Sequence, residues 1–126
     1  MHFLPSVNKN QLSAVHSIFD MATSTVLPIE ALYANSANKV FDAFAAGTPL
    51  LINHGGWIKE LIERTESGLV INNTPTIVDY SRLKDFLLSE QDYEKACSAS
   101  FDLGQSEYNR EQLFKTFLSV IEEGII

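Results

Sequence analysis

Hydrophobic and polar positions follow one another along this chain in the order expected of an α/β domain. Short apolar runs typical of strands occur near Phe3 and in the stretches 50–52 and 69–71, and the stretch 23–27 is rich in residues that favour strands. Between these runs, apolar residues recur every three to four positions, which is the period of a helix that buries one face. Strands that alternate with helices form parallel sheets with right-handed crossovers. We therefore predict a Rossmann-like, three-layer parallel sheet of about four short strands with flanking helices.

The segment 35–60, NSANKVFDAFAAGTPLLINHGGWIKE, carries the clearest succession of elements. Ser36 or Asn35 can cap a helix, because a short polar side chain accepts a hydrogen bond from a free N–H of the first turn. Gly47 suits the left-handed position after that helix, and Pro49 prevents its continuation. A loop, a helix and a tight turn are therefore expected before the next strand.

The same segment continues with a strand and a glycine turn. The apolar run 50–52 is uninterrupted, as expected for a strand covered on both faces. Gly55 and Gly56 follow, where the backbone can turn sharply or approach a ligand closely. A helix over 57–65 comes next, and Gly68 is expected to end it.

The second half of the chain is predicted to be helical. One helix starts at Asp79 or Ser81, another runs from about 91 to 103 and breaks at Gly104, and the last spans about 109–123. The last has the strongest apolar stripe, formed by Leu113, Phe114, Phe117, Leu118 and Ile121. Nothing in this half suggests chemistry, and its acidic residues are expected to form a solvated face.

Composition narrows the classes of function. A chain of 126 residues with 45% hydrophobic content is ordinary material for one domain, 1–126, with its own core. The net charge of −7 and the lack of a basic cluster argue against nucleic acid as a partner, since phosphate backbones are bound by Lys and Arg. The single Cys97 excludes an intrachain disulfide, and no Cys/His cluster suggests zinc. We expect no metal and no cofactor.

The start of the chain also bears on location. The residues MHFLPSVNK lack the charged start and the apolar run of a signal peptide, and no segment has the apolar length needed to span a bilayer. We therefore expect a cytoplasmic protein. Peripheral attachment to the inner face of the membrane through a partner domain is compatible with this expectation.

The polar edge of the segment 35–60 suggests a ligand. A helix N-terminus presents free N–H groups and the positive end of the dipole, so the amides near Ala37, Asn38 and Lys39 form a potential anion site. Asp42 lies four residues beyond Asn38, on the same side of the helix and about 6 Å further along. This spacing suits a diphosphate followed by a ribose diol. The alternative is an ordinary cap and a solvated acid, which spacing alone favours.

The same residues carry a resemblance to a known family. SANKVFDAFAAGTPLLINHGGWIKELI resembles the donor-binding segment of family 4 glycosyltransferases with the GT-B fold, and is similar to bacterial enzymes of capsule and O-antigen assembly. FDAFAAGTPLL matches the acid-Ala-x-Ala-x-Gly-x-Pro pattern of that family, and GGWIKEL matches its Gly-Gly turn followed by an acid. Weaker likeness extends from Phe3 to about Gly68, roughly the first half of the chain.

The resemblance implies roles for the helix at the centre of the segment. Asp42 stands where the family usually has the second Glu of its Glu, seven residues, Glu motif, and that acid holds the ribose hydroxyls. The amides from Ser36 to Lys39 would face the diphosphate. The first Glu of the motif would fall at Ala34, which departs from the pattern because its side chain accepts no hydrogen bond.

The residues after the strand are candidates of a second kind. His54 ends the apolar strand against Gly55 and Gly56, and it is either close to the transferred sugar and leaving phosphate or simply a polar strand-end residue. Glu60 matches the acid after the Gly-Gly turn of the family. Its alternative role is that of a first-turn acid that complements the helix dipole.

The resemblance implies a partial C-terminal, nucleotide-sugar-binding domain. The acceptor-binding N-terminal domain of the family, and the basic residues that contact donor phosphates, have no counterpart in these 126 residues. We therefore expect the chain to bind a UDP- or GDP-linked sugar for retaining transfer in cell-surface polysaccharide or glycoconjugate biosynthesis, but to be inactive alone. An N-terminal acceptor domain or partner subunit would complete the glycosyltransferase. The alternative is a non-catalytic α/β interaction module or a subunit of a split enzyme.

Overall fold

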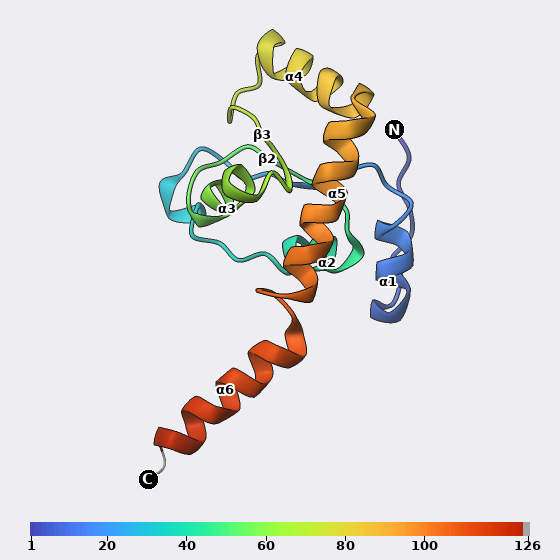
Figure 1. Cartoon of the computed structure of the whole chain (residues 1–126). Helices are drawn as coiled ribbons and strands as arrows, with labels where there is room; N and C mark the ends of the chain where they lie inside the picture. The colour runs from blue at the N-terminus through green and yellow to red at the C-terminus, as the bar shows by residue number, and fades with distance from the viewer. Residues whose placement is uncertain (125–126) are drawn as a thin grey trace.

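A parallel sheet of three strands forms the centre of the computed structural model, which describes residues 1–124. The strands are β1 (Ala22–Ser24), β2 (Leu50–Ile52) and β3 (Gly68–Val70), with β2 between the other two. Helix α2 (Asn38–Ala46) connects β1 to β2, and helix α3 (Trp57–Thr65) connects β2 to β3 (Figure 1). The α/β class and the parallel arrangement of the strands are confirmed.

The predicted strand near Phe3 does not form in the described part of the chain. Residues 1–8 have no regular secondary structure, and the side chains of Phe3 and Leu4 are 85% and 62% exposed. The strand at 23–27 is also shorter than predicted, since β1 ends at Ser24. A run of apolar residues forms a strand only where a neighbouring strand pairs with its backbone. In the described residues β1 pairs with β2 alone, so the segment near Phe3 has no strand beside it.

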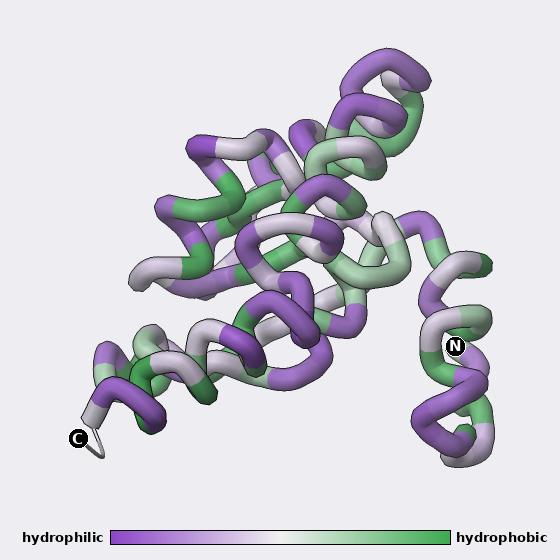
Figure 2. Tube along the Cα trace, turned by 60° about the horizontal axis from the view of Figure 1, so that its bottom comes forward, coloured by the Kyte–Doolittle hydropathy of each residue, from purple (hydrophilic) through white to green (hydrophobic). Residues whose placement is uncertain are grey.

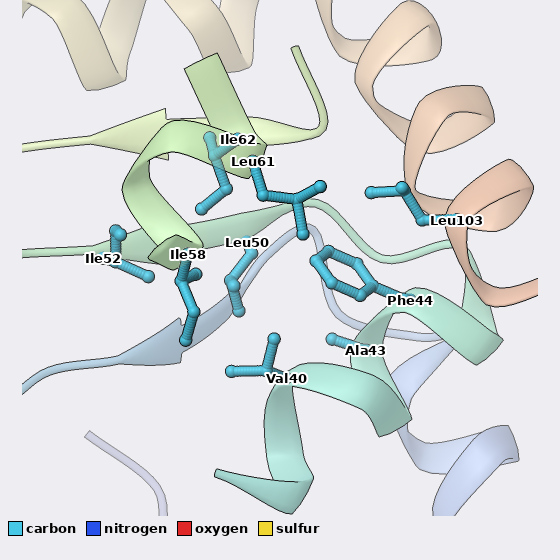
Figure 3. Packing of buried hydrophobic residues seen from close by; sticks show 9 residues of the cluster. All are labelled: Val40, Ala43, Phe44, Leu50, Ile52, Ile58, Leu61, Ile62 and Leu103. Carbon is cyan, nitrogen blue, oxygen red and sulfur yellow. The ribbon is translucent and has the colours of Figure 1, made fainter. Parts of the chain in front are cut away.

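One face of the sheet carries the hydrophobic core. Leu50 and Ile52 point to this face, and α2 and α3 both pack on it, as right-handed crossovers in one direction require (Figure 3). The buried residues of the core are Val40, Ala43, Phe44, Leu50, Ile52, Ile58, Leu61, Ile62 and Leu103. The ring of Phe44 is fully buried among them.

The opposite face of the sheet is much less covered. Leu51 points to this face together with its register partners Thr23 and Leu69. Thr23 is exposed, and Leu51 and Leu69 are only partly buried. Among the helices of residues 1–124, those with extensive contacts to strands are α2 and α3. The expectation that β2 is covered on both faces is therefore not met within this part of the chain.

Helix α5 (Glu90–Gln105) packs along α2 near the amino ends of the strands. Its Ser100 donates a hydrogen bond to the carbonyl of Ser67, the residue before β3, over 3.0 Å. The helix continues through Gly104, where it was predicted to break, because the absent side chain lets α5 approach α2. A Cβ at Gly104 would come within 2.7 Å of the Phe44 backbone.

The ends of other elements also differ from the predictions. Helix α3 ends at Glu66, which adopts the left-handed conformation with φ 57°, rather than at Gly68. Gly68 instead begins β3, where a Cβ would overlap the Leu50 carbonyl. Helix α4 begins after Thr76, and Asp79 lies within its first turn. The remaining helices are α1 (Lys9–His16), the short 3-10 turn η1 (Glu30–Leu32), α4 (Ile77–Leu88) and α6 (Arg110–Gly124).

The core predicts a large difference between two phenylalanines. We expect Phe44→Ala to lower the free energy of unfolding by about 3–5 kcal/mol, because it removes a fully buried ring and leaves a cavity. Phe3→Ala removes the same ring from an exposed side chain and is expected to change this free energy by less than about 0.5 kcal/mol. Urea titration followed by circular dichroism measures both values, and similar losses would contradict the described core.

Candidate functional site

The candidate residues lie on two segments, 36–42 and 54–60, that meet at the carboxyl edge of the sheet. Helices α2 and α3 both start at this edge, since each follows a parallel strand. The rings of Phe41 in α2 and Trp57 in α3 stack, with centroids 6.2 Å apart and an interplanar angle of 19°. The two predicted segments are therefore neighbours at the carboxyl edge of the sheet.

The first turn of α2 has free amide groups. The N-cap residue is Ala37, and no side chain caps the helix. The predicted cap at Ser36 or Asn35 is therefore wrong, since both residues precede the N-cap position. The N–H groups of Asn38 and Lys39 have no acceptor among the described residues, and both residues are exposed. This turn can accept an anion from solvent.

Helix α3 begins in a similar way. Its N-cap residue is Gly56, with φ 88° and no side-chain cap. A Cβ at Gly56 would overlap the carbonyl oxygen of Tyr33, so both the conformation and the close approach require glycine. By contrast, α1, α4 and α5 are capped by the side chains of Asn8, Thr76 and Ser89. The two helices that border the candidate site therefore share an open first turn.

His54 is held against the glycine turn. The residue is 5% exposed, and its Nδ1–H donates to the carbonyl of Gly55 over 2.7 Å. Because a carbonyl only accepts, Nδ1 carries the proton in this bond. The imidazole also stacks on Tyr33, with centroids 5.8 Å apart and an interplanar angle of 21°. The structure thus brings His54, Gly55 and Gly56 together with Tyr33, which sequence analysis did not select.

Asp42 lies on the outer side of α2. Val40, Ala43 and Phe44 face the core, and the helical period places Asp42 and Asn38 on the opposite side. Asp42 is half-buried and forms no ion pair within the described part of the chain. Its carboxylate is therefore not committed to another side chain there.

Glu60 lies in a different setting from His54. It borders a shallow depression of about 280 Å³ that is also lined by Trp57, Leu61, Arg64 and Tyr108. Arg64 pairs with Glu107 over 3.4 Å at this depression. The structure therefore associates Glu60 with the aromatic cluster around Tyr108, and not with the contacts that hold His54.

Two asparagines that sequence analysis did not select hold the carboxyl edge together. The side chain of Asn53, the residue after β2, accepts from the N–H of Val26 over 2.9 Å and donates to its carbonyl over 3.0 Å. Asn73 donates to the same carbonyl over 3.0 Å and to the carbonyl of Asn53 over 3.3 Å. These bonds fix the loop that leads from β1 toward Tyr33. A polar residue soon after a buried strand is the signal in the sequence that could have identified Asn53 and Asn73.

A buried carboxylate fixes the start of α4 at the same edge. Asp79 is 2% exposed and accepts hydrogen bonds from the N–H and hydroxyl of Thr76, over 2.9 and 3.0 Å, and from the amide side chain of Asn72 over 2.9 Å. Arg82 lies 3.6 Å away. The Thr76 and Asn72 bonds favour the ionised form and lower the pKa of Asp79 to about 2. Its role is that of a structural cap.

Other classes of site find no support in residues 1–124. No group of three or more His, Cys, Asp or Glu side chains there could hold a metal ion. No helix in the described residues has the length and apolar character to cross a bilayer. Burial raises the pKa of the Cys97 thiol, which is the opposite of nucleophile activation.

In comparisons with known proteins, no family model and no curated protein matches this chain.

The close approach at Gly56 leads to a testable expectation. Gly56→Ala should lower the free energy of unfolding by about 1–3 kcal/mol. The backbone of an alanine is strained at φ 88°, and its methyl group would overlap the Tyr33 carbonyl. Gly124→Ala is the matched control, since no atom lies within 4 Å of the added group and alanine favours a helix. Chemical unfolding curves of the two variants give the comparison, and a loss at Gly124 equal to that at Gly56 would argue against the described turn.

The lowered pKa of Asp79 predicts a dependence of stability on pH. The carboxylate stabilises the fold fully above its ordinary pKa of 3.8, and this contribution is lost as pH falls toward about 2. Asp79→Asn should therefore be less stable than the wild type at pH 7 and should lose less stability between pH 4 and pH 2. Asp85→Asn alters an exposed acid of the same helix and should keep the wild-type profile. Melting temperatures measured across this range test the prediction, which fails if the Asp79 variant parallels the wild type.

Proposed function

We propose that this chain is the nucleotide-sugar-binding part of a retaining glycosyltransferase of cell-surface polysaccharide or glycoconjugate biosynthesis. The observation that carries the proposal is the pair of uncapped helix N-termini, α2 and α3, at the carboxyl edge of one sheet. Two sets of free N–H groups and two positive dipole ends suit a diphosphate. The resemblance of the segment 36–62 to family 4 glycosyltransferases supports the same interpretation.

The proposed roles are those that the resemblance implies, considered together with the contacts of each side chain. The amides from Ser36 to Lys39 bind the diphosphate, and Lys39 adds a mobile positive charge. Asp42 accepts hydrogen bonds from the ribose diol, and it has no competing ion pair in the described residues. In this proposal His54, whose Nδ1 is bonded to the Gly55 carbonyl, contacts the transferred sugar or the leaving phosphate.

The catalytic contribution of such a site is electrostatic. Helix-end amides stabilise the negative charge of the departing diphosphate, and the fixed nucleoside aligns the sugar with its acceptor. Asp42 orients the nucleoside and does not transfer a proton. In this proposal the complete sheet is Rossmann-like and three-layered, and an N-terminal acceptor domain or a partner subunit completes the enzyme. That partner would cover the face of Thr23, Leu51 and Leu69.

A second candidate function is that of a non-catalytic α/β interaction module. The observation that favours it is the little-covered sheet face, together with exposed apolar side chains in the first third of the chain. These side chains are Phe3, Leu4, Ile18, Phe19, Leu27 and Ile29. Exposed apolar surface usually marks an interface with another protein.

Calorimetric titration with UDP, GDP and the corresponding nucleotide sugars separates the two functions. We expect one nucleoside diphosphate to bind, and Asp42→Ala to weaken that binding about 10- to 100-fold, since a hydrogen bond to a charged group contributes roughly 1.5–3 kcal/mol. Asp85→Ala, an exposed acid on α4, is the control and should bind as the wild type does. The free nucleoside should bind far more weakly, because it lacks the anion. Absence of heat with every nucleotide would favour the interaction module.

A further inference from the structure

The loop 27–36, between β1 and α2, is held to the rest of the molecule mainly through one side chain. All residues of this loop are described, and every one of them is exposed except Tyr33, which is partly buried. Figure 1 shows the loop, in light blue to cyan, beside α3. The position of an exposed loop depends on the few contacts that it makes with the body of the molecule. Tyr33 is therefore the residue that places this loop.

Tyr33 contacts three consecutive residues of the glycine turn. Its ring stacks on the imidazole of His54, with centroids 5.8 Å apart and an interplanar angle of 21°. A Cβ built at Gly55 would lie 3.5 Å from Cδ2 of the Tyr33 ring, and a Cβ at Gly56 would overlap the Tyr33 carbonyl oxygen. The turn thus presents backbone without side chains at positions 55 and 56, and Tyr33 lies against it.

We propose that Tyr33 is a positioning residue of the candidate site, which orients His54 toward its ligand. The inference rests on the proposed function, in which His54 contacts the sugar or the leaving phosphate. The bond from Nδ1 to the Gly55 carbonyl fixes one edge of the imidazole, and the Tyr33 stack fixes its plane. His54 is 5% exposed, so little of its ring is open to a ligand. Its orientation therefore decides whether a ligand at the carboxyl edge meets it.

Tyr33 also joins the two segments of the candidate site. It lies three residues before Ser36, where the amides proposed to bind the diphosphate begin. The chain between them is tightly turned, since the N–H of Asn35 donates to the carbonyl of Leu32 over 3.2 Å. A group bound to the first turn of α2 and a group bound beside His54 are thereby placed relative to each other. Tyr33 makes this connection ahead of the two helices, whose aromatic stack joins them further along.

Proton NMR of the chain without ligand tests the position of His54. The rings of Tyr33 and His54 should give nuclear Overhauser contacts in the wild type. Tyr33→Leu should move the His54 ring protons downfield, because it removes the ring current of the stacked tyrosine. Tyr33→Phe should keep their position, since it keeps the ring. The signals of His2 and His16 should not change, and Tyr80→Leu, which alters a tyrosine 63% exposed on α4, is the matched control.

Calorimetry with the nucleoside diphosphate that binds the wild type measures the consequence for the ligand. Tyr33→Leu should weaken binding about 2- to 10-fold, which corresponds to the loss of one aromatic pair, and Tyr33→Phe should restore the wild-type affinity. In a His54→Ala background, Tyr33→Leu should have no further effect, because a positioning residue acts through the group that it positions. Losses that add in the double variant would overturn the proposal.

The two measurements distinguish this inference from the proposed function. If no nucleoside diphosphate binds the wild type while the His54 signals respond to Tyr33→Leu as expected, the proposed function fails and the positioning of His54 by Tyr33 is supported. Unchanged His54 signals in Tyr33→Leu would overturn the inference, whatever the chain binds. The absence of Overhauser contacts between the two rings in the wild type would also overturn it, and that measurement requires no variant to fold.

Discussion

The burial of Phe44 between β2, α3 and α5 connects parts of the chain that are far apart in sequence. Its ring lies in the core formed by the strand, α3 and Leu103, and its backbone contacts Gly104 of α5. The ring also packs against Tyr108, with centroids 5.9 Å apart. Because interiors are close-packed, the position of α2 is determined by these contacts. The position of α2 in turn determines where its open N-terminus lies.

The candidate site depends on this packing in a direct way. The inward sides of α2 and α3 are anchored by apolar contacts, so their first turns meet at the carboxyl edge of the sheet without needing side-chain caps. Asn53 and Asn73 hold the loop after β1 at the same edge through Val26. The first-turn amides of α2 and α3 are therefore uncapped, while the side chains that shape the edge are hydrogen-bonded to the backbone of that edge.

On two outer surfaces of the molecule, it is apolar side chains that lack a partner within residues 1–124. The sheet face of Leu51 and Leu69 and the stripe of α6 are apolar surfaces without a cover in residues 1–124. On both surfaces apolar side-chain area remains to be buried, and burying it favours association with another chain. The sheet face is the surface that both proposed functions cover with another chain, and the stripe of α6 is a separate apolar surface, on the helix that leads to the C-terminus in Figure 2.

The sequence by itself determined the helices and strands whose ends depend on residues close by in the chain. The bounds of β2 and α3 agree with their predicted ranges, because apolar periodicity and the flanking Gly47, Pro49 and Gly56 act within a few residues. The tertiary structure decided whatever depends on distant partners. Gly104 stays helical because it packs on Phe44, and Phe3 forms no strand because β1 offers it no pairing. Contact between the segments 36–42 and 54–60 likewise required the fold, since sequence spacing does not specify which side chains meet across a sheet edge.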